Sequence, residues 1–406
     1  MSFYVKLILS KANRITQTGG PDMPEYIKRS GTDSAKWDGL KQTFGEEGLL
    51  PFWVADMDFR VDSHIEEALR AYLDTGAYGY YTVPDSYYDA FIEWEKREHG
   101  LFVEREWIRF TPGVVSGFHF AVNILTEPGD AVILTTPVYY PFMNAVKNNG
   151  RKMICSELVN RDSRYYIDFE DFERKIQENS VKAFILCSPH NPVSRIWSED
   201  ELKTLLDICR RNGVALISDE IHHDLVFGGN THTPTLSLAD ESDRIIMFTA
   251  ASKTFNIAAF QNSFAVIKNP QLREEWDRFI GGIRTGSGNP LGYIATEAAY
   301  RYGKPWLEDV KETIYGNYQY IKEQFAEDLP EVRVTPLEAT YLAWADLGAY
   351  VKAGELEDFI QKKCRLAFDY GTWFGGDRSS TFIRINLATS RENIEELVRR
   401  IVSNLK

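Results

Sequence analysis

The hydrophobic positions between about residues 105 and 285 form short apolar runs that alternate with amphipathic segments. Short apolar runs are typical of buried strands, and an amphipathic repeat is typical of a helix. Strands and helices in regular alternation favour an α/β fold built on a doubly wound, mostly parallel sheet. The predicted strands cover residues 131–134, 183–187, 214–218, 245–248 and 263–267, and predicted helices cover 118–125 and 200–211.

Outside this region the pattern is more helical, and it predicts a second domain. An apolar segment at 49–59 ends in two acids, which suggests a strand that runs into a loop facing a site. Residues 1–30 show no clear pattern and are expected to form an arm. Further helices are predicted at 65–73, 87–99 and 306–325, and further strands at 340–344 and 381–387.

Polar or aromatic residues follow several of the predicted strands. In an open α/β sheet, ligands bind outside the carboxyl ends of the strands, so these side chains are expected to converge on one crevice. A lysine by itself is more often an ordinary surface residue. Lys253 is a candidate site residue because other polar and aromatic residues follow the neighbouring strands. The residues at the strand ends are Tyr139, Asn191, Asp219, His222 and Lys253.

This set of side chains suits pyridoxal 5′-phosphate. An amine whose pKa falls on desolvation suits Schiff-base chemistry with an aldehyde, which is the role expected of Lys253. Asp219 is expected to hold the ring nitrogen protonated. Asn191 is expected to donate a hydrogen bond to the phenolic oxygen, and Tyr139 to stack on the ring face. Each residue also has a structural explanation, since Asn191 precedes a proline and Asp219 can cap a helix.

Two further elements complete the expected site. Val114, Val115 and Ser116 follow a glycine at a predicted helix start, where free backbone N–H groups can bind a phosphate. Arg384 is expected to bind the substrate α-carboxylate through its guanidinium fork, although it can equally be half of a structural ion pair.

Composition narrows the class of partner. Lys and Arg number 46 against 59 Asp and Glu, so the net charge of −13 argues against nucleic acid or an anionic membrane as a partner. The four cysteines form no CxxC pair, which suits reduced thiols in the cytoplasm and gives no support to a metal site. No apolar run reaches the length of a membrane-spanning helix, and no signal peptide is recognised.

The chain resembles fold-type-I pyridoxal-phosphate enzymes of the aspartate aminotransferase superfamily, and within it the MalY/PatB-like branch of cystathionine β-lyase-type C–S lyases. The resemblance runs from about residue 29 to the C-terminus. It implies a large domain with a mostly parallel seven-stranded sheet (66–299) and a smaller α+β domain (31–65 and 300–406). The segments that carry it are residues 34–38, 53–59, 188–192, 219–222, 252–258, 339–344 and 382–388.

The resemblance also implies site residues and a partner. Ala55, in the Trp53–Phe59 string, is expected beside the substrate, and His222 beside the phenolic oxygen, where aminotransferases usually have tyrosine. A homodimer with active sites at the interface is implied, and Tyr80 matches the tyrosine that reaches the cofactor phosphate of the neighbouring subunit.

The phosphate site departs from the superfamily pattern. Ala250 and Gln261 stand where a serine and an arginine are frequent. The phosphate is therefore expected to depend more on backbone amides, Ser252 and Tyr80.

Three functions stay open on the sequence. The first is β-elimination from L-cystathionine or a related cysteine S-conjugate, which gives a thiol, pyruvate and ammonia. The second is transamination on the same scaffold, which the residue types do not separate from the first. The third, by analogy alone, is a regulatory protein interaction. A nucleotide-dependent dehydrogenase is disfavoured, because no G-x-G-x-x-G follows an early strand.

Overall fold

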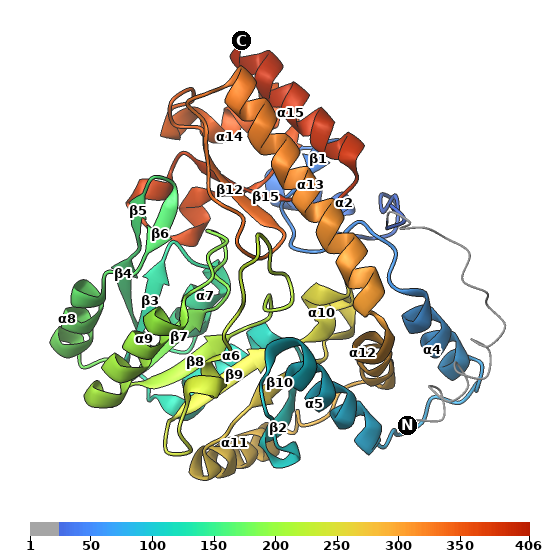
Figure 1. Cartoon of the computed structure of the whole chain (residues 1–406), viewed down its shortest axis with the longest axis vertical. Helices are drawn as coiled ribbons and strands as arrows, with labels where there is room; N and C mark the ends of the chain where they lie inside the picture. The colour runs from blue at the N-terminus through green and yellow to red at the C-terminus, as the bar shows by residue number, and fades with distance from the viewer. Residues whose placement is uncertain (1–23) are drawn as a thin grey trace.

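The computed structural model describes residues 24–406, and most of the arm predicted at 1–30 lies outside the described residues. Its main feature is a seven-stranded sheet in the order β2-β10-β9-β8-β7-β3-β4, in which β10 runs antiparallel to its two neighbours (Figure 1). The alternation of strands and helices therefore gives the predicted α/β fold with a mostly parallel sheet. The strands are β2 (Ile108–Thr111), β3 (Ala131–Thr136), β4 (Lys152–Glu157), β7 (Ala183–Cys187), β8 (Ala215–Asp219), β9 (Ile245–Thr249) and β10 (Ser263–Val266).

Both faces of this sheet are buried, and successive strand residues contribute to different cores. In β9, Ile245 and Met247 pack into one hydrophobic cluster, whereas Ile246 and Phe248 pack into the other. This follows from the two-residue period of a strand and explains why the strands are apolar throughout. The second cluster is covered by α6 (Val114–Leu125), α7 (Tyr140–Asn148) and α11 (Pro270–Ile283).

Helices on the other face belong to the larger cluster, which continues into the part of the molecule formed by the chain ends. Leu202 of α9 (Glu199–Asn212) and Phe172 of α8 (Phe169–Asn179) both lie in it. The helices that contribute to it are α4 (Ser63–Leu73), α5 (Asp85–His99), α8 (Phe169–Asn179), α9 (Glu199–Asn212), α12 (Pro290–Tyr302), α13 (Lys304–Asp328) and α15 (Arg391–Leu405).

A second, antiparallel sheet has the order β11-β12-β15-β14 and packs beneath α13 and α15 (Figure 1). Its strands are β11 (Arg333–Val334), β12 (Leu342–Asp346), β14 (Asp369–Tyr370) and β15 (Phe382–Asn386). The strand predicted at 340–344 begins later because Thr340 has a left-handed φ of 65°, which an extended strand does not allow.

The strand predicted at 49–59 is wrong for most of its length. It is reduced to β1 (Leu50–Pro51), which pairs with β13 (Leu366–Ala367). In the following residues, backbone carbonyls accept hydrogen bonds from a side chain rather than from a neighbouring strand. Asn386 donates to the carbonyls of Val54 and Asp56 at 2.6 Å each. The predicted loop that faces a site is present, because Ala55 lines a cavity. The boundaries of the two predicted domains remain a prediction.

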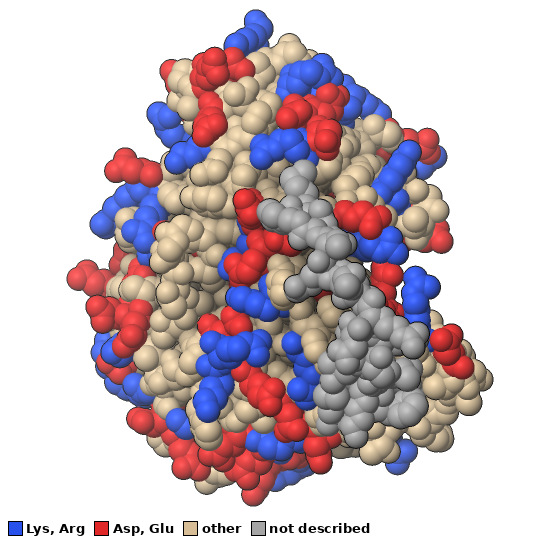
Figure 2. All heavy atoms as spheres, turned by 45° about the vertical axis from the view of Figure 1, so that its right-hand side comes forward, with Lys and Arg blue, Asp and Glu red and all other residues tan. Residues whose placement is uncertain are grey.

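Among the described residues, no helix is both long and apolar enough to cross a bilayer. On the face drawn in Figure 2, basic and acidic side chains are interspersed, and acidic side chains gather along the lower edge. A continuous basic surface of the kind that binds nucleic acid does not extend over the coloured residues of this face.

Candidate active site

Lys253 lies in the short helix α10 (Ala251–Thr254), which follows β9 almost directly. Its Nζ donates a hydrogen bond of 2.6 Å to the carbonyl oxygen of Ala55. Burial lowers the pKa of Lys253 to about 8, against the opposing effect of the Asp56 and Asp219 carboxylates. The amine is thus held at the carboxyl end of the sheet and is neutral in part of the molecules at physiological pH.

Asp219 is the last residue of β8, so its carboxyl group lies at the same edge of the sheet as Lys253. It accepts a hydrogen bond of 3.2 Å from the backbone N–H of Ile221. Burial nevertheless raises its pKa to about 7, even though that hydrogen bond and the Lys253 ammonium favour the ionised form. Such a carboxyl group is stabilised as an anion when a further cation lies against it.

The two residues open on one cavity of about 260 Å³. Most of the residues predicted from the strand ends and the helix start line it together, which confirms that these segments converge in space. Its lining consists of Ala55, Pro112, Gly113, Val114, Val115, Ser116, Phe118, Tyr139, Cys187, Asn191, Asp219, Ile221, His222, Ser252, Lys253, Ala258 and Gln261.

One end of the cavity is the start of α6. Gly113 precedes the helix with a φ of 87°, and no side chain caps the helix there. The first N–H groups of a helix have no intrahelical acceptor and carry the positive end of its dipole. The start of α6, with Val114 and Val115, therefore offers an anion site to this cavity. Ser252 and Gln261 lie on the same cavity, whereas Ala250 does not line it.

Arg384 projects from β15 of the second sheet and reaches Asn191. Its Nη1 donates to Asn191 Oδ1 at 3.0 Å, and its Nη2 donates to the Trp53 carbonyl at 2.8 Å. Because the Asn191 oxygen is used in this way, its NH₂ group is left as the donor toward the cavity. Nη2 also pairs with the Asp369 carboxylate. The guanidinium is therefore held in one orientation by Trp53 from the N-terminal part of the chain and by Asp369 from the C-terminal part.

His222 and Tyr139 form walls of the cavity. Burial and the nearby Lys253 ammonium lower the pKa of His222, so its imidazole is neutral. Its Nδ1 is buried and has no hydrogen-bond partner among the described residues. Burial raises the pKa of Tyr139, whose ring precedes α7, and its phenol stays protonated.

Tyr80 is not brought to this cavity. It lies between α4 and α5 with a fully exposed side chain.

Sequence reasoning missed two residues close to the site. Tyr341 donates from its hydroxyl to the Ala55 carbonyl at 2.8 Å, so that oxygen accepts from both Tyr341 and Lys253. Tyr341 lies in residues 339–344, one of the segments that carry the family resemblance, and that is the signal that could have found it. Asp369 gave none, because its contact with Arg384 depends on the pairing of β14 with β15.

A comparison with protein families decides the class. The model described as "Aminotransferase class I and II" matches residues 56–401. The chain belongs to this family. The match includes all the cavity-lining residues from the strand ends.

Individual relatives have narrower descriptions. The chain is 40% identical to cystathionine beta-lyase PatB of Bacillus subtilis over 93% of its own length and 98% of that protein. It is 30% identical to protein MalY of Escherichia coli over 95% and 99% of the two chains. Its structure matches cystalysin from Treponema denticola, which contains pyridoxal 5′-phosphate, with a TM-score of 0.90 at 38% identity over 95% and 98%. It matches the PLP-bound C-S lyase from Staphylococcus hominis with a TM-score of 0.89 at 33% identity over 97% and 99%.

Proposed function

We propose that this protein is a pyridoxal-phosphate-dependent C–S lyase that performs β-elimination on L-cystathionine or a related cysteine S-conjugate. The observation that carries the proposal is the meeting of Lys253, Asp219 and Asn191 at one cavity, with Arg384 hydrogen-bonded to Asn191 behind its lining. The relatives described as cystathionine β-lyases and C-S lyases support the sulfur substrate.

The residues present fit both ends of pyridoxal phosphate, the phosphate group and the ring nitrogen. The start of α6 suits the phosphate, because its orphan N–H groups face an anion without a competing side-chain cap. At the other end, the buried Asp219 carboxyl suits a protonated ring nitrogen, which supplies the cation that its raised pKa calls for. Lys253 would hold the aldehyde carbon, with Asn191 and His222 near the phenolic oxygen and Tyr139 against the ring.

Arg384 would bind the α-carboxylate of the amino acid. Its guanidinium is fixed by Asn191, Trp53 and Asp369, so little side-chain freedom is lost on binding. The same contacts orient the α-carbon relative to Lys253.

Once the amino group of the substrate has taken the place of Lys253 at the aldehyde carbon, the freed Lys253 amine would act as the base at the α-carbon. A pKa of about 8 leaves roughly a tenth of the amine neutral at pH 7, compared with under a thousandth for a lysine of ordinary pKa. When bound, the cofactor supplies an electron sink that stabilises the negative charge left at the α-carbon. The bond from the β-carbon to sulfur then breaks, and the sulfur leaves with the electron pair as a thiolate. The three-carbon product takes up one water and yields pyruvate and ammonia.

The carbonyl of Ala55 would guide the proton on Lys253. It lies 2.6 Å from Nζ and also accepts from Tyr341, so it fixes the direction of one N–H bond. The lone pair of the neutral amine is thereby oriented away from Ala55.

We also propose a homodimer in the cytoplasm. The fully exposed Tyr80 would reach the cofactor phosphate of the neighbouring subunit, and exposed Tyr78 beside it adds apolar surface of the kind found at interfaces. The cytoplasm is supported by four cysteines that are all free thiols, since disulfides are rare there.

The decisive experiment incubates the holoenzyme with L-cystathionine and follows free thiol and pyruvate together. Equal amounts of the two are expected, and the Lys253→Ala protein should form neither. A 2-oxo acid without thiol, together with conversion of the cofactor to its pyridoxamine form, would establish transamination instead.

The dimer has a separate test. Lys253→Ala and Tyr80→Ala chains, each of low activity alone, are mixed under mild denaturation and returned to buffer. If Tyr80 serves the partner's site, mixed dimers contain one intact site and activity reappears. Mixtures no more active than their components would exclude the shared site.

A further inference from the structure

Six titratable side chains form a buried network on α5 and on the loop after β8, separate from the cavity lining. We call it the buried histidine cluster. It contains three histidines and three carboxylates, which is an unusual number of ionisable groups for a protein interior. Its members are Glu95, His99, Glu220, His223, Asp224 and His232.

The carboxylates in this cluster differ in how they are satisfied. Glu220 accepts from the hydroxyls of Ser218 at 2.8 Å and Thr235 at 2.6 Å, and pairs with His232 at 2.8 Å. Glu95 is equally buried, but neither of its oxygens has a hydrogen-bond partner in the described part of the chain. A buried carboxylate without a partner is costly, so Glu95 needs a cation or a proton.

His223, in the loop after β8, faces Glu95 of α5. Its Nε2 lies 3.5 Å from Glu95 Oε1, 3.5 Å from Asp224 Oδ2 and 3.3 Å from the hydroxyl of Thr249. These separations are longer than an ordinary N–H···O hydrogen bond, and a single N–H can point at one acceptor. No short hydrogen bond therefore closes the 3.5 Å gap between Nε2 and Glu95 Oε1, where a cation could bind both atoms.

His99 brings a second imidazole to the same place. Its ring centre lies 4.0 Å from that of His223, so two protonated rings there would repel each other. Its Nε2 lies 2.7 Å from Asp224 Oδ1. A histidine that binds a metal ion commonly donates its other N–H to a carboxylate in this way.

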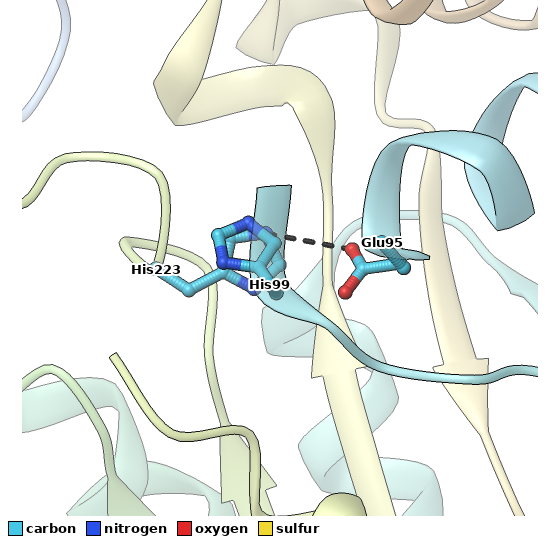
Figure 3. Close-up of side chains that lie close together, drawn as sticks. All are labelled: Glu95, His99 and His223. Atoms are coloured by element: carbon cyan, nitrogen blue, oxygen red, sulfur yellow. Dashed lines mark ion pairs between the residues drawn. The ribbon is translucent and has the colours of Figure 1, made fainter. Parts of the chain in front are cut away.

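We propose that Glu95, His99 and His223 bind a zinc ion. One ligand atom from each of the three lies within 4.8 Å of the others, and Figure 3 shows the side chains converging from the end of α5 and from the loop after β8. Zinc takes imidazole nitrogen and carboxylate oxygen at tetrahedral positions, which sets two ligand atoms about 3.4 Å apart. The 3.5 Å between Glu95 Oε1 and His223 Nε2 matches that separation.

The zinc ion has a structural role behind the active site. His223 follows His222, which lines the cavity, and Asp224 accepts from the hydroxyl of Thr254, the neighbour of Lys253, at 2.6 Å. The ion therefore fastens α5 to the loop after β8, which carries His222 and is itself hydrogen-bonded to α10 through Asp224. Because Glu95 is fully buried, zinc enters as the chain folds rather than by diffusion into the folded protein.

The test is the metal content of untagged holoenzyme from cells grown with added zinc sulfate. After denaturation, a chromogenic chelator is expected to report about one zinc per chain. Zinc-edge X-ray absorption of the intact protein should give nitrogen and oxygen neighbours at about 2.0–2.2 Å. Holoenzyme that folds with zinc available yet holds almost none would overturn the proposal and leave a protonated His223 beside Glu95.

Variants locate the ion. Glu95→Gln keeps the size of the side chain and removes its charge, and His99→Ala removes a ligand near the helix end. Each should lose most of the zinc while the yellow cofactor and lyase activity show that the chain has folded. His64→Ala changes a histidine outside the cluster, and this control variant should keep its full zinc content. Zinc retained in both cluster variants, or sulfur neighbours in the spectrum, would place the ion elsewhere and refute this site.

Discussion

Replacing Asp219 with asparagine should have opposite effects on the stability of the cofactor-free protein and on the activity of the holoenzyme. The substitution removes the charge and keeps the shape. Asparagine Oδ1 can still accept the N–H of Ile221, which Asp219 accepts at 3.2 Å. Any change therefore reports on the carboxylate charge at the end of β8.

The magnitude follows from the pKa of Asp219, which burial raises from 3.8 to about 7. This rise of about three units corresponds to about 4 kcal/mol. The folded state holds its proton more tightly than the unfolded state, so stability falls as pH rises from about 4 to about 7. Above that window, the full cost is present in wild type and absent in Asp219→Asn. The variant without cofactor should therefore melt about 5 °C higher at pH 8 if the whole chain unfolds together.

In the holoenzyme, a protonated ring nitrogen would offset the cost of burying the Asp219 anion. The carboxylate would then contribute to catalysis by keeping that nitrogen protonated. If most of the about 4 kcal/mol is lost from the transition state, kcat/KM falls by up to about 10³-fold.

Both arms use the same two proteins. Melting is followed by circular dichroism after the cofactor is removed with hydroxylamine, and pyruvate release is followed after it is restored. Cofactor content, measured after release in alkali, controls for poor binding. The reasoning fails if the cofactor-free variant is no more stable than wild type at about pH 8, or if the loaded variant keeps nearly full activity.

Three further predictions concern other parts of the molecule. The rate at which cofactor-free protein captures pyridoxal phosphate should rise about tenfold per pH unit and level off near pH 8, the pKa of Lys253; a rise that continues to pH 10 would mean an ordinary lysine. Lys36→Met breaks the fully buried ion pair with Asp58 (2.7 Å) and should cost about 3–5 kcal/mol in urea unfolding, with part restored by adding Asp58→Asn; an additive loss would contradict the pairing. Gly117→Ala places a Cβ 2.5 Å from Phe248 Cε1 and should cost about 1–3 kcal/mol, measured by the same unfolding, whereas Gly281→Ala, which meets open space, should not.

The sequence predicted the sheet and most of the cavity because both depend on local patterns. A strand buried on both faces is apolar throughout; Asp219 ends one such strand, and Asn191 follows another. Parallel strands bring their carboxyl ends to one edge, so position in the chain sufficed to place these residues together.

Several contacts that depend on long-range packing were not predicted. The segment after Pro51 is apolar like a strand, but Asn386 donates hydrogen bonds to two of its carbonyls. Asn386 lies more than 300 residues away, and no local pattern predicts such a partner. The contact of Glu95 with His223 likewise depends on how α5 packs against the sheet. Read alone, Glu95 is one acid in a helix rich in charge.

The carbonyl of Ala55 has a consequence for synthesis of the chain. It is held by Lys253 and by Tyr341, while its neighbours are held by Asn386, so one short loop is fixed by groups from the middle and the end of the sequence. A ribosome must release nearly the whole polypeptide before this loop can settle. Until then, the large sheet can form with its lysine in place but without the oxygen that orients it. A chain ending before β15 should therefore remain catalytically silent, however well its large sheet is folded.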